Sequence, residues 1–153
     1  MATYTATVHW QRGDRDFAGG KYSRGHRWIF DGGASIDASA SPHIVPLPYS
    51  LEEAVDPEEA FVAAASSCHM LFYLHFAQRA GYVVDDYRDD AEGFMARNAD
   101  GRMAITRIIL RPTVRYAGDA PDAETEAALH HEAHEACFIA NSVTAEIETV
   151  LAD

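Results

Sequence analysis

Residues 56–81 read DPEEAFVAAASSCHMLFYLHFAQRAG and contain the longest uncharged run of the chain. Asp56 is a favoured N-cap residue, Pro57 suits the first helical position, and Glu59 follows at the spacing of a capping box. Gly81 supplies a stop signal at the other end. Apolar residues recur between these signals at helical spacing, so the stretch predicts one long helix.

The uncharged run from Ala60 to Ala77 is long enough to be tested as a membrane span, because a bilayer needs roughly 18 apolar residues or more. Polar side chains interrupt it, among them Ser66, His69 and His75. The rest of the chain has the pattern of a globular domain that needs a core helix. We therefore expect a long central helix buried in protein, and no membrane partner.

The bulk composition limits the classes of function. A chain of 153 residues fits one domain, which we place at residues 1–153. The net charge of −12 disfavours nucleic acid as a partner, because nucleic-acid binding needs clustered Lys and Arg. The N-terminal residues lack the basic-then-apolar arrangement of an export signal, so we expect a cytoplasmic protein. In that setting Cys68 and Cys137 are either inert core residues or a redox or metal pair.

The first third of the chain has strand and loop signals. Residues 3–10 and 21–30 predict two strands paired as a hairpin, and residues 33–41 contain one more short strand. Residues 41–50, SPHIVPLPYS, hold three prolines and predict a loop. Such a loop either lines a pocket or connects elements at the surface.

After the long helix a β region begins at residues 82–84. Strands are predicted at 88–97 and 102–116, a second helix at 121–138 and a closing strand at 141–151. The order predicts an α+β fold with a mostly antiparallel sheet and no second domain.

Histidines gather on the second predicted helix. His130, His134 and Cys137 lie at i, i+4 and i+7 and share one face, and His131 is their neighbour. This spacing brings two or three ligands toward one metal ion. Three successive turns, however, span about 10 Å along the axis. We therefore favour polar packing or an interface role for these histidines and expect no metal.

Charge around Cys68 has to come from outside its own helix. Cys68 lies about eleven residues into the helix, beyond the reach of the N-terminal dipole, so a cation from elsewhere must stabilise its thiolate. Arg24 and Arg27 on the second predicted strand are candidates. Glu58 is separated from Cys68 by about 15 Å of helix rise. Glu58 and Cys68 therefore belong to one site only if the helix breaks between them or a second subunit supplies one of them.

Taken together, these features resemble the OsmC/Ohr family of thiol-dependent organic hydroperoxide reductases. The resemblance covers nearly the whole chain. It rests on Arg24-Gly25 after the N-terminal strand and turn, on DPEEAFVAAASSCH at residues 56–69, and on Cys137, 69 positions after Cys68. It implies an OsmC-like fold, an intertwined homodimer with active sites at the interface, and no bound cofactor. Family members carry proline after the second cysteine, where this chain has Phe138.

The resemblance also implies a mechanism. Cys68 is the peroxidatic cysteine, Cys137 the resolving cysteine, and Arg24 and Glu58 position and polarise the reacting groups. The Cys68 thiolate attacks the peroxide and becomes a sulfenic acid, which condenses with Cys137 to a disulfide. An external dithiol protein, of lipoyl type in this family, reduces that disulfide. Four aromatic residues are either pocket walls or plain core: Trp28, Tyr49, Phe61 and Phe72.

Two other readings stay open at this point. The chain is alternatively a non-catalytic dimeric module of the same fold that binds a small apolar ligand and keeps its thiols buried and inert. A His/Cys metal binder is the third reading.

Overall fold

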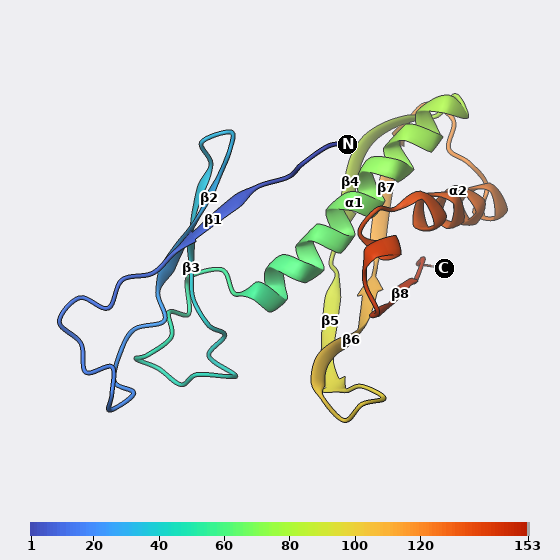
Figure 1. Ribbon diagram of the computed structural model, residues 1–153. Helices are drawn as coiled ribbons and strands as arrows, with labels where there is room; N and C mark the ends of the chain where they lie inside the picture. Colours follow the sequence, from blue (N-terminus) through green and yellow to red (C-terminus); the bar gives the residue numbers. More distant parts are fainter. Residues whose placement is uncertain (153) are drawn as a thin grey trace. The chain divides into compact units, whose positions relative to one another are not determined.

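The computed structural model describes residues 1–152 and groups them into two compact units, Met1–Ala60 and the residues from Phe61 onward (Figure 1). Each unit has its own sheet structure. The single domain over residues 1–153 stays a prediction.

The first unit contains a three-stranded antiparallel sheet. Its strands are β1 (Ala6–His9), β2 (His26–Phe30) and β3 (Ser35–Ala38), in the order β1-β2-β3. The register pairs Val8 with Trp28 and Trp28 with Ile36. The predicted hairpin and the third short strand are both confirmed.

The predicted loop at residues 41–50 is also confirmed, and serines hold it in place. The carbonyl of Ser41 accepts hydrogen bonds from the amides of Ile44 (3.0 Å) and Val45 (2.9 Å). Ser39 is buried, and its hydroxyl accepts the Leu51 amide at 3.0 Å. These local bonds replace the strand or helix ladder that three prolines exclude.

The long helix α1 runs unbroken over Pro57–Arg79 and is capped as predicted. The Glu59 amide donates to Asp56 Oδ1 at 2.8 Å, and the Asp56 amide donates to Glu59 Oε2 at 3.2 Å, which completes a capping box. At the other end Gly81 takes φ +90°, the left-handed conformation that ends many helices. Both ends of α1 were therefore readable from the sequence.

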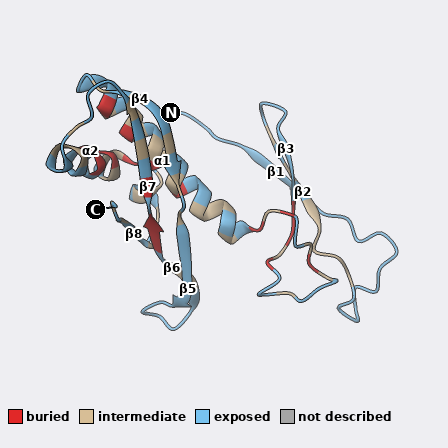
Figure 2. Ribbon diagram, turned by 180° about the vertical axis from the view of Figure 1, so that it is seen from behind, coloured by how far each residue is buried: buried red, intermediate tan, exposed pale blue. Residues whose placement is uncertain are grey.

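The single chain covers α1 less completely than we expected. Its buried residues are Ala65, His69, Tyr73 and Ala77, one narrow stripe at four-residue spacing (Figure 2). Of the 18-residue segment of α1 with the apolar composition of a membrane span, only 22% is buried, and Leu71 is 60% exposed. By length and composition alone α1 is apolar enough to cross a membrane. Its buried polar residues nevertheless bond to other protein elements, as they do in a helix that packs against protein.

The second unit holds two further sheets. Strand β4 (Val83–Asp89) pairs antiparallel with β7 (Pro112–Ala117). Strand β5 (Glu92–Arg97) pairs antiparallel with β6 (Met103–Leu110), and β8 (Glu146–Thr149) lies parallel to β6. The α+β class with mostly antiparallel pairing is confirmed.

The two long strands predicted at 88–97 and 102–116 are wrong in extent, because each is divided between the two sheets. The break has a tertiary cause. Asp89 Oδ1 accepts the backbone N–H of Arg111 at 2.6 Å, so that amide leaves the strand ladder. Pro112 follows and has no amide hydrogen to donate.

The second helix, α2, spans Ala123–Ala136, two residues shorter at each end than predicted. Asp122 caps it by accepting the Thr125 amide at 2.8 Å. A 3₁₀ turn, η1 (Ala140–Ser142), occupies the start of the predicted strand 141–151, so β8 is shorter than expected.

Two apolar clusters form the core of the second unit. The helix cluster joins α1 to α2 through Tyr73, Ala77, Leu129 and Ala133, and Phe72 packs against it. The sheet cluster joins α1 to β6 through Ala65, Ile108 and Leu110, with Phe61 packed against it. Phe61 and Phe72 are thus partly buried residues that pack against the core.

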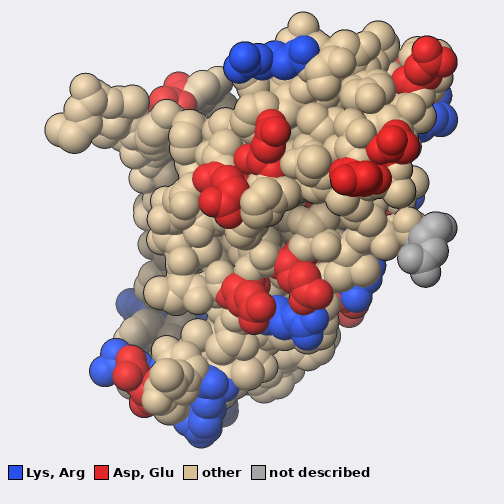
Figure 3. Space-filling view, turned by 90° about the vertical axis from the view of Figure 1, so that its right-hand side faces the viewer, with Lys and Arg blue, Asp and Glu red and all other residues tan. Residues whose placement is uncertain are grey.

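On the face in Figure 3, acidic side chains are spread among uncharged ones, in keeping with the net charge of −12.

Candidate functional site

The two cysteines, 69 positions apart in sequence, are neighbours in the second unit. Cys68 is half-buried midway along α1, and Cys137 is 2% exposed at the C-cap of α2. Both are free thiols. The Cys68 thiol is close enough to act as a hydrogen-bonding neighbour that contributes to the raised pKa of Cys137. The fold therefore brings together the two residues that disulfide formation requires.

The environment of Cys137 keeps it protonated. Burial is the main cause that raises the pKa of its thiol, and the neighbouring Cys68 raises it further. The backbone amide of Ala140, 3.4 Å from Sγ, and that of Ile139 oppose this shift in the pKa. Since the thiolate is the nucleophilic form, Cys68, the more accessible thiol, is the better candidate for attack on a substrate.

A hydrogen-bonded turn holds Cys137. The side-chain amide of Asn141 donates to the carbonyls of Glu135 (2.9 Å) and Cys137 (3.1 Å). Cys137 itself is extended, with φ −63° and ψ 115°, the conformation that precedes a proline. Phe138 therefore departs from the family pattern in its side chain, while the backbone at Cys137 is the one that proline would require.

Arg24 lies in the first unit and is held from several directions. Its Nη1 donates to the carbonyls of Gly20 (3.1 Å) and Tyr22 (2.7 Å), and its guanidinium lies 3.7 Å from the centroid of the Tyr22 ring. It lines a cavity of about 540 Å³ together with Trp10, Phe17 and Tyr22. The other candidate cation, Arg27, is instead paired at the surface with Asp37 at 2.7 Å.

Glu58 is half-buried in the first turn of α1. Its neighbours Asp56 and Glu59, not Glu58, form the cap. Within residues 1–152, no ion pair or hydrogen bond joins Glu58 to Arg24, so the single chain does not bring this predicted pair together. Because α1 is unbroken, about 15 Å of helix rise separates Glu58 from Cys68.

A buried histidine pair joins α1, which carries Cys68, to α2, which ends next to Cys137. His69 follows Cys68 on α1 and is 1% exposed, and His130 on α2 is 3% exposed. His69 Nε2 and His130 Nδ1 are 2.9 Å apart, and the two rings are stacked with planes 5° apart. His130 also stacks on Tyr73, with ring centroids 4.0 Å apart.

Both histidines are neutral at pH 7. Burial lowers the pKa of His69 to about 4, with a further lowering from His134 and an opposing effect of Asp89. Burial likewise lowers the pKa of His130 to about 3, with His69 adding to the effect. One ring therefore donates and the other accepts. The sequence places His130 on a helix face and gives no sign of its pairing with His69, although His69 occupies a stripe position between Ala65 and Tyr73.

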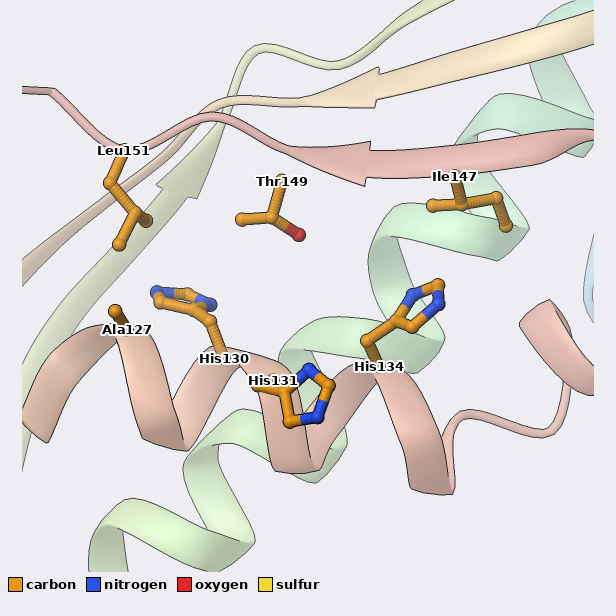
Figure 4. Close-up of a pocket in the computed structure, with 7 residues that line it drawn as sticks. All are labelled: Ala127, His130, His131, His134, Ile147, Thr149 and Leu151. Carbon is orange, nitrogen blue, oxygen red and sulfur yellow. The ribbon is translucent and has the colours of Figure 1, made fainter.

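The α2 histidines do not converge. A cavity of about 260 Å³ lies between α2 and β8 and is lined by Ala127, His130, His131, His134, Ile147, Thr149 and Leu151. Figure 4 shows His130 and His134 rising separately toward β8 while His131 lies apart from both. Cys137 is turned toward Cys68 instead. Within residues 1–152, no group of three His, Cys, Asp or Glu side chains is arranged to hold a metal ion.

Comparison with known sequences gives two matches. The sequence pattern of the family described as OsmC-like protein matches residues 50–152. The uncharacterized protein YmaD of Bacillus subtilis is 26% identical over 103 residues, which are 65% of this chain and 67% of that protein.

Similar solved structures cover nearly the whole chain. An OsmC-like protein of unknown function from Vibrio cholerae is 49% identical, with a TM-score of 0.97 over 99% of this chain and 100% of the other. The organic hydroperoxide resistance protein OsmC of Legionella pneumophila has a TM-score of 0.74 at 15% identity, over 100% of this chain and 98% of the other. OhrB, the organic hydroperoxide resistance protein of B. subtilis, has a TM-score of 0.65 at 16% identity, over 99% and 98%. Because their sequence identities are only 15% and 16%, the last two structures show a shared fold and no more.

Proposed function

The chain belongs to the OsmC-like protein family, and on that premise we propose that it is a cysteine-based peroxidase that reduces organic hydroperoxides to alcohols. One observation carries the proposal. A half-buried Cys68 thiol lies beside the buried thiol of Cys137, in a family that includes proteins named for organic hydroperoxide resistance. The expected setting is the cytoplasm, with no bound cofactor.

The proposed reaction has three steps. The Cys68 thiolate attacks the outer oxygen of ROOH, so that an S–O bond forms, the O–O bond breaks and the alkoxide leaves as the alcohol after taking a proton. Cys137 then attacks Sγ of the Cys68 sulfenic acid, which releases water and forms the disulfide. An external dithiol protein, which we expect to be of lipoyl type, restores both thiols by exchange.

Arg24 and Glu58 enter this proposal through a second copy of the chain. Because α1 has no break, Glu58 and Cys68 of one chain cannot meet. Only one stripe of α1 is buried, which leaves apolar surface for another chain to cover. We therefore expect a homodimer in which one copy supplies Glu58 and the other supplies the thiols, and in which Arg24 comes to Glu58 on assembly. Arg24 would stabilise the thiolate and the departing oxygen, and Glu58 would hold Arg24.

Peroxide consumption tests the proposal. Wild-type protein with cumene hydroperoxide and dihydrolipoamide should turn over repeatedly, and Cys68→Ser should fall to the uncatalysed rate. Without the dithiol, Cys137→Ser should release one alcohol and stop as a sulfenic acid. Ser67→Ala, an exposed neighbour on α1, is the matched control and should keep wild-type activity. If Cys68→Ser consumes peroxide as fast as the wild type, the proposal is wrong.

The second candidate is a non-catalytic binding module of the same fold. The cavity of about 540 Å³ lined by Trp10, Phe17 and Tyr22 favours it, because aromatic cavities of this size take small apolar ligands. In that case alkylating reagents should label neither thiol of the native protein. Peptide mapping after peroxide should then find neither sulfenic acid nor a Cys68–Cys137 disulfide, which separates the two candidates.

A further inference from the structure

We propose that His69 and His130 are positioning residues that fix the register of α2 on α1 and thereby hold the Cys137 thiol against the Cys68 thiol. The inference deepens the proposed function, on which it rests for its biological role. The quantity that it concerns is the equilibrium constant for forming the Cys68–Cys137 disulfide, which can be measured without any peroxide.

The placement of the pair supports this role. His69 is the residue after Cys68 on α1. His130 lies seven residues before Cys137, about two helical turns along α2 and on the same face. A bond between the two imidazoles therefore ties the segment that carries one thiol to the helix that ends at the other.

The bond is also the directional contact between these helices. Among residues 1–152, the His69–His130 bond is the one side-chain hydrogen bond between a residue within α1 and a residue within α2, and the contact between Cys68 and Cys137 lies just beyond the end of α2. The other contacts belong to the helix cluster, where Ala77 and Ala133 are small and apolar. Apolar burial is non-directional and constrains register weakly. A slip of one turn, about 5.4 Å, would break the imidazole bond and carry Cys137 away from Cys68.

Surrounding residues hold the pair in place. Tyr73 of α1 stacks on the His130 ring with planes 21° apart. The Tyr73 hydroxyl is hydrogen-bonded to that of Tyr116 on β7, and Tyr116 donates to Glu126 Oε1 on α2 at 3.0 Å. Tyr73, which stacks on the His130 ring, is thus itself held by Tyr116 of β7 and, through Tyr116, by Glu126 of α2.

The test is the equilibrium between the reduced protein and glutathione. One oxidised glutathione takes two electrons from Cys68 and Cys137, which yields the protein disulfide and two reduced glutathiones. The equilibrium constant reports how readily the two thiols meet. His130→Leu should lower it about tenfold, the effect of one lost hydrogen bond between neutral groups. His130→Asn places an amide nitrogen near the position of Nδ1 and should restore most of the wild-type value.

Matched controls come from the same helices. His131 on α2 and His75 on α1 are exposed, and neither forms part of the pair. His131→Gln and His75→Gln should leave the equilibrium constant unchanged. Urea unfolding of each reduced variant shows which are folded and separates a loss of register from a loss of stability.

His130→Leu leaves His69 buried without a partner, and this variant could fail to fold for that reason. A double variant then provides the test. His69→Leu with His130→Leu replaces both polar groups, which costs little stability when shape is kept. It should show the same lowered equilibrium constant. The inference is overturned if folded His130→Leu or the double variant forms the disulfide as readily as the wild type. A protein that passes this test but consumes no peroxide would overturn the proposed function alone.

Discussion

Ser66 on α1 donates a hydrogen bond from Oγ to Oδ2 of Asp89 at the end of β4. The other oxygen of the same carboxylate accepts the Arg111 amide at 2.6 Å. One side chain therefore joins the helix to the point where both long β segments divide between two sheets. The sequence pattern of the strands contains no sign of this contact.

Removing the Asp89 carboxylate should destabilise the protein. Asp89→Ala leaves the Ser66 hydroxyl and the Arg111 amide without their acceptor, and we expect a loss of about 2–4 kcal/mol of unfolding free energy. Asp89→Asn keeps an acceptor oxygen and should lose less. Urea unfolding midpoints measure the difference. Asp90→Ala is the control, because among residues 1–152 Asp90 pairs only with Arg88 at the surface and its loss should leave the midpoint unchanged.

The ends of α1 could be predicted from the sequence, whereas the break in the strands could not. Both ends of α1 are set by residues within a few positions of one another, such as Asp56 and Glu59, so local chemistry predicts them. The strand break at Arg111 depends on a side chain 22 positions away, and the His69–His130 bond joins residues 61 positions apart. Contacts of that kind exist only once the chain is folded. Cys68 and Cys137 stand out as the two cysteines of the sequence, and the family resemblance supplies the roles that local chemistry leaves open.

Acid should weaken the fold through the buried histidine pair. The folded-state pKa values of His69 and His130, about 4 and about 3, lie below the ordinary value of 6.5. The unfolded chain therefore takes up protons below about pH 6.5 that the folded chain refuses. Stability is fully present above that pH and falls as the pH drops toward 4. The groups that face the pair are Tyr73, Tyr87, His134 and Asp89, and only Asp89 opposes the shift.

Urea unfolding between pH 7 and pH 5 measures this effect. We expect a loss of roughly 2–4 kcal/mol, since one histidine contributes at most about 1.4 kcal/mol per pH unit. The double variant His69→Leu with His130→Leu should show a much smaller change of unfolding free energy with pH. His131→Gln should follow the wild type. A double variant that is as acid-sensitive as the wild type would contradict the assignment.

Two carboxylates at the start of α1, one just before the helix and one in its first turn, should separate stability from activity. Asp56→Ala removes the cap and should cost about 1 kcal/mol of unfolding free energy. Glu58→Gln leaves the cap intact, so we expect unchanged stability but a lower kcat/KM for cumene hydroperoxide. Arg24→Met should lower kcat/KM by about 100-fold, as the loss of a charge-stabilising donor does in other enzymes. Equal activity of Glu58→Gln and the wild type would remove Glu58 from the proposed site.

Gly93 on β5 should not tolerate a side chain. A Cβ built there would lie 2.5 Å from Cγ2 of Val62 on α1, closer than real contacts allow. Gly93→Ala should therefore destabilise the protein by about 1–3 kcal/mol through overpacking. Gly32→Ala is the matched control, because a Cβ at Gly32 meets no atom within 4 Å. Thermal or urea unfolding of both variants distinguishes overpacking from a general intolerance of alanine.

Phe138→Pro should leave the turn at Cys137 intact. The extended backbone of Cys137 already fits a following proline. The lost group is the ring that packs edge-on against Phe72, with centroids 5.0 Å apart. We expect a cost of about 0.5–1.5 kcal/mol and an unchanged disulfide equilibrium with glutathione. Phe138→Ala is the comparison, and a proline variant far less stable than the alanine variant would show that the turn itself differs from the family's.

The stripe of buried residues on α1 has a last consequence. Steps of four residues overshoot one helical turn, so the stripe winds around α1 and meets the sheet cluster at Ala65 but the helix cluster at Tyr73 and Ala77. Cys68 lies between these points in the sequence, so its position depends on how both clusters hold α1. We expect the loosening of either cluster to shift Cys68 relative to Cys137. The disulfide equilibrium is thus a gauge of how firmly the two cores are joined.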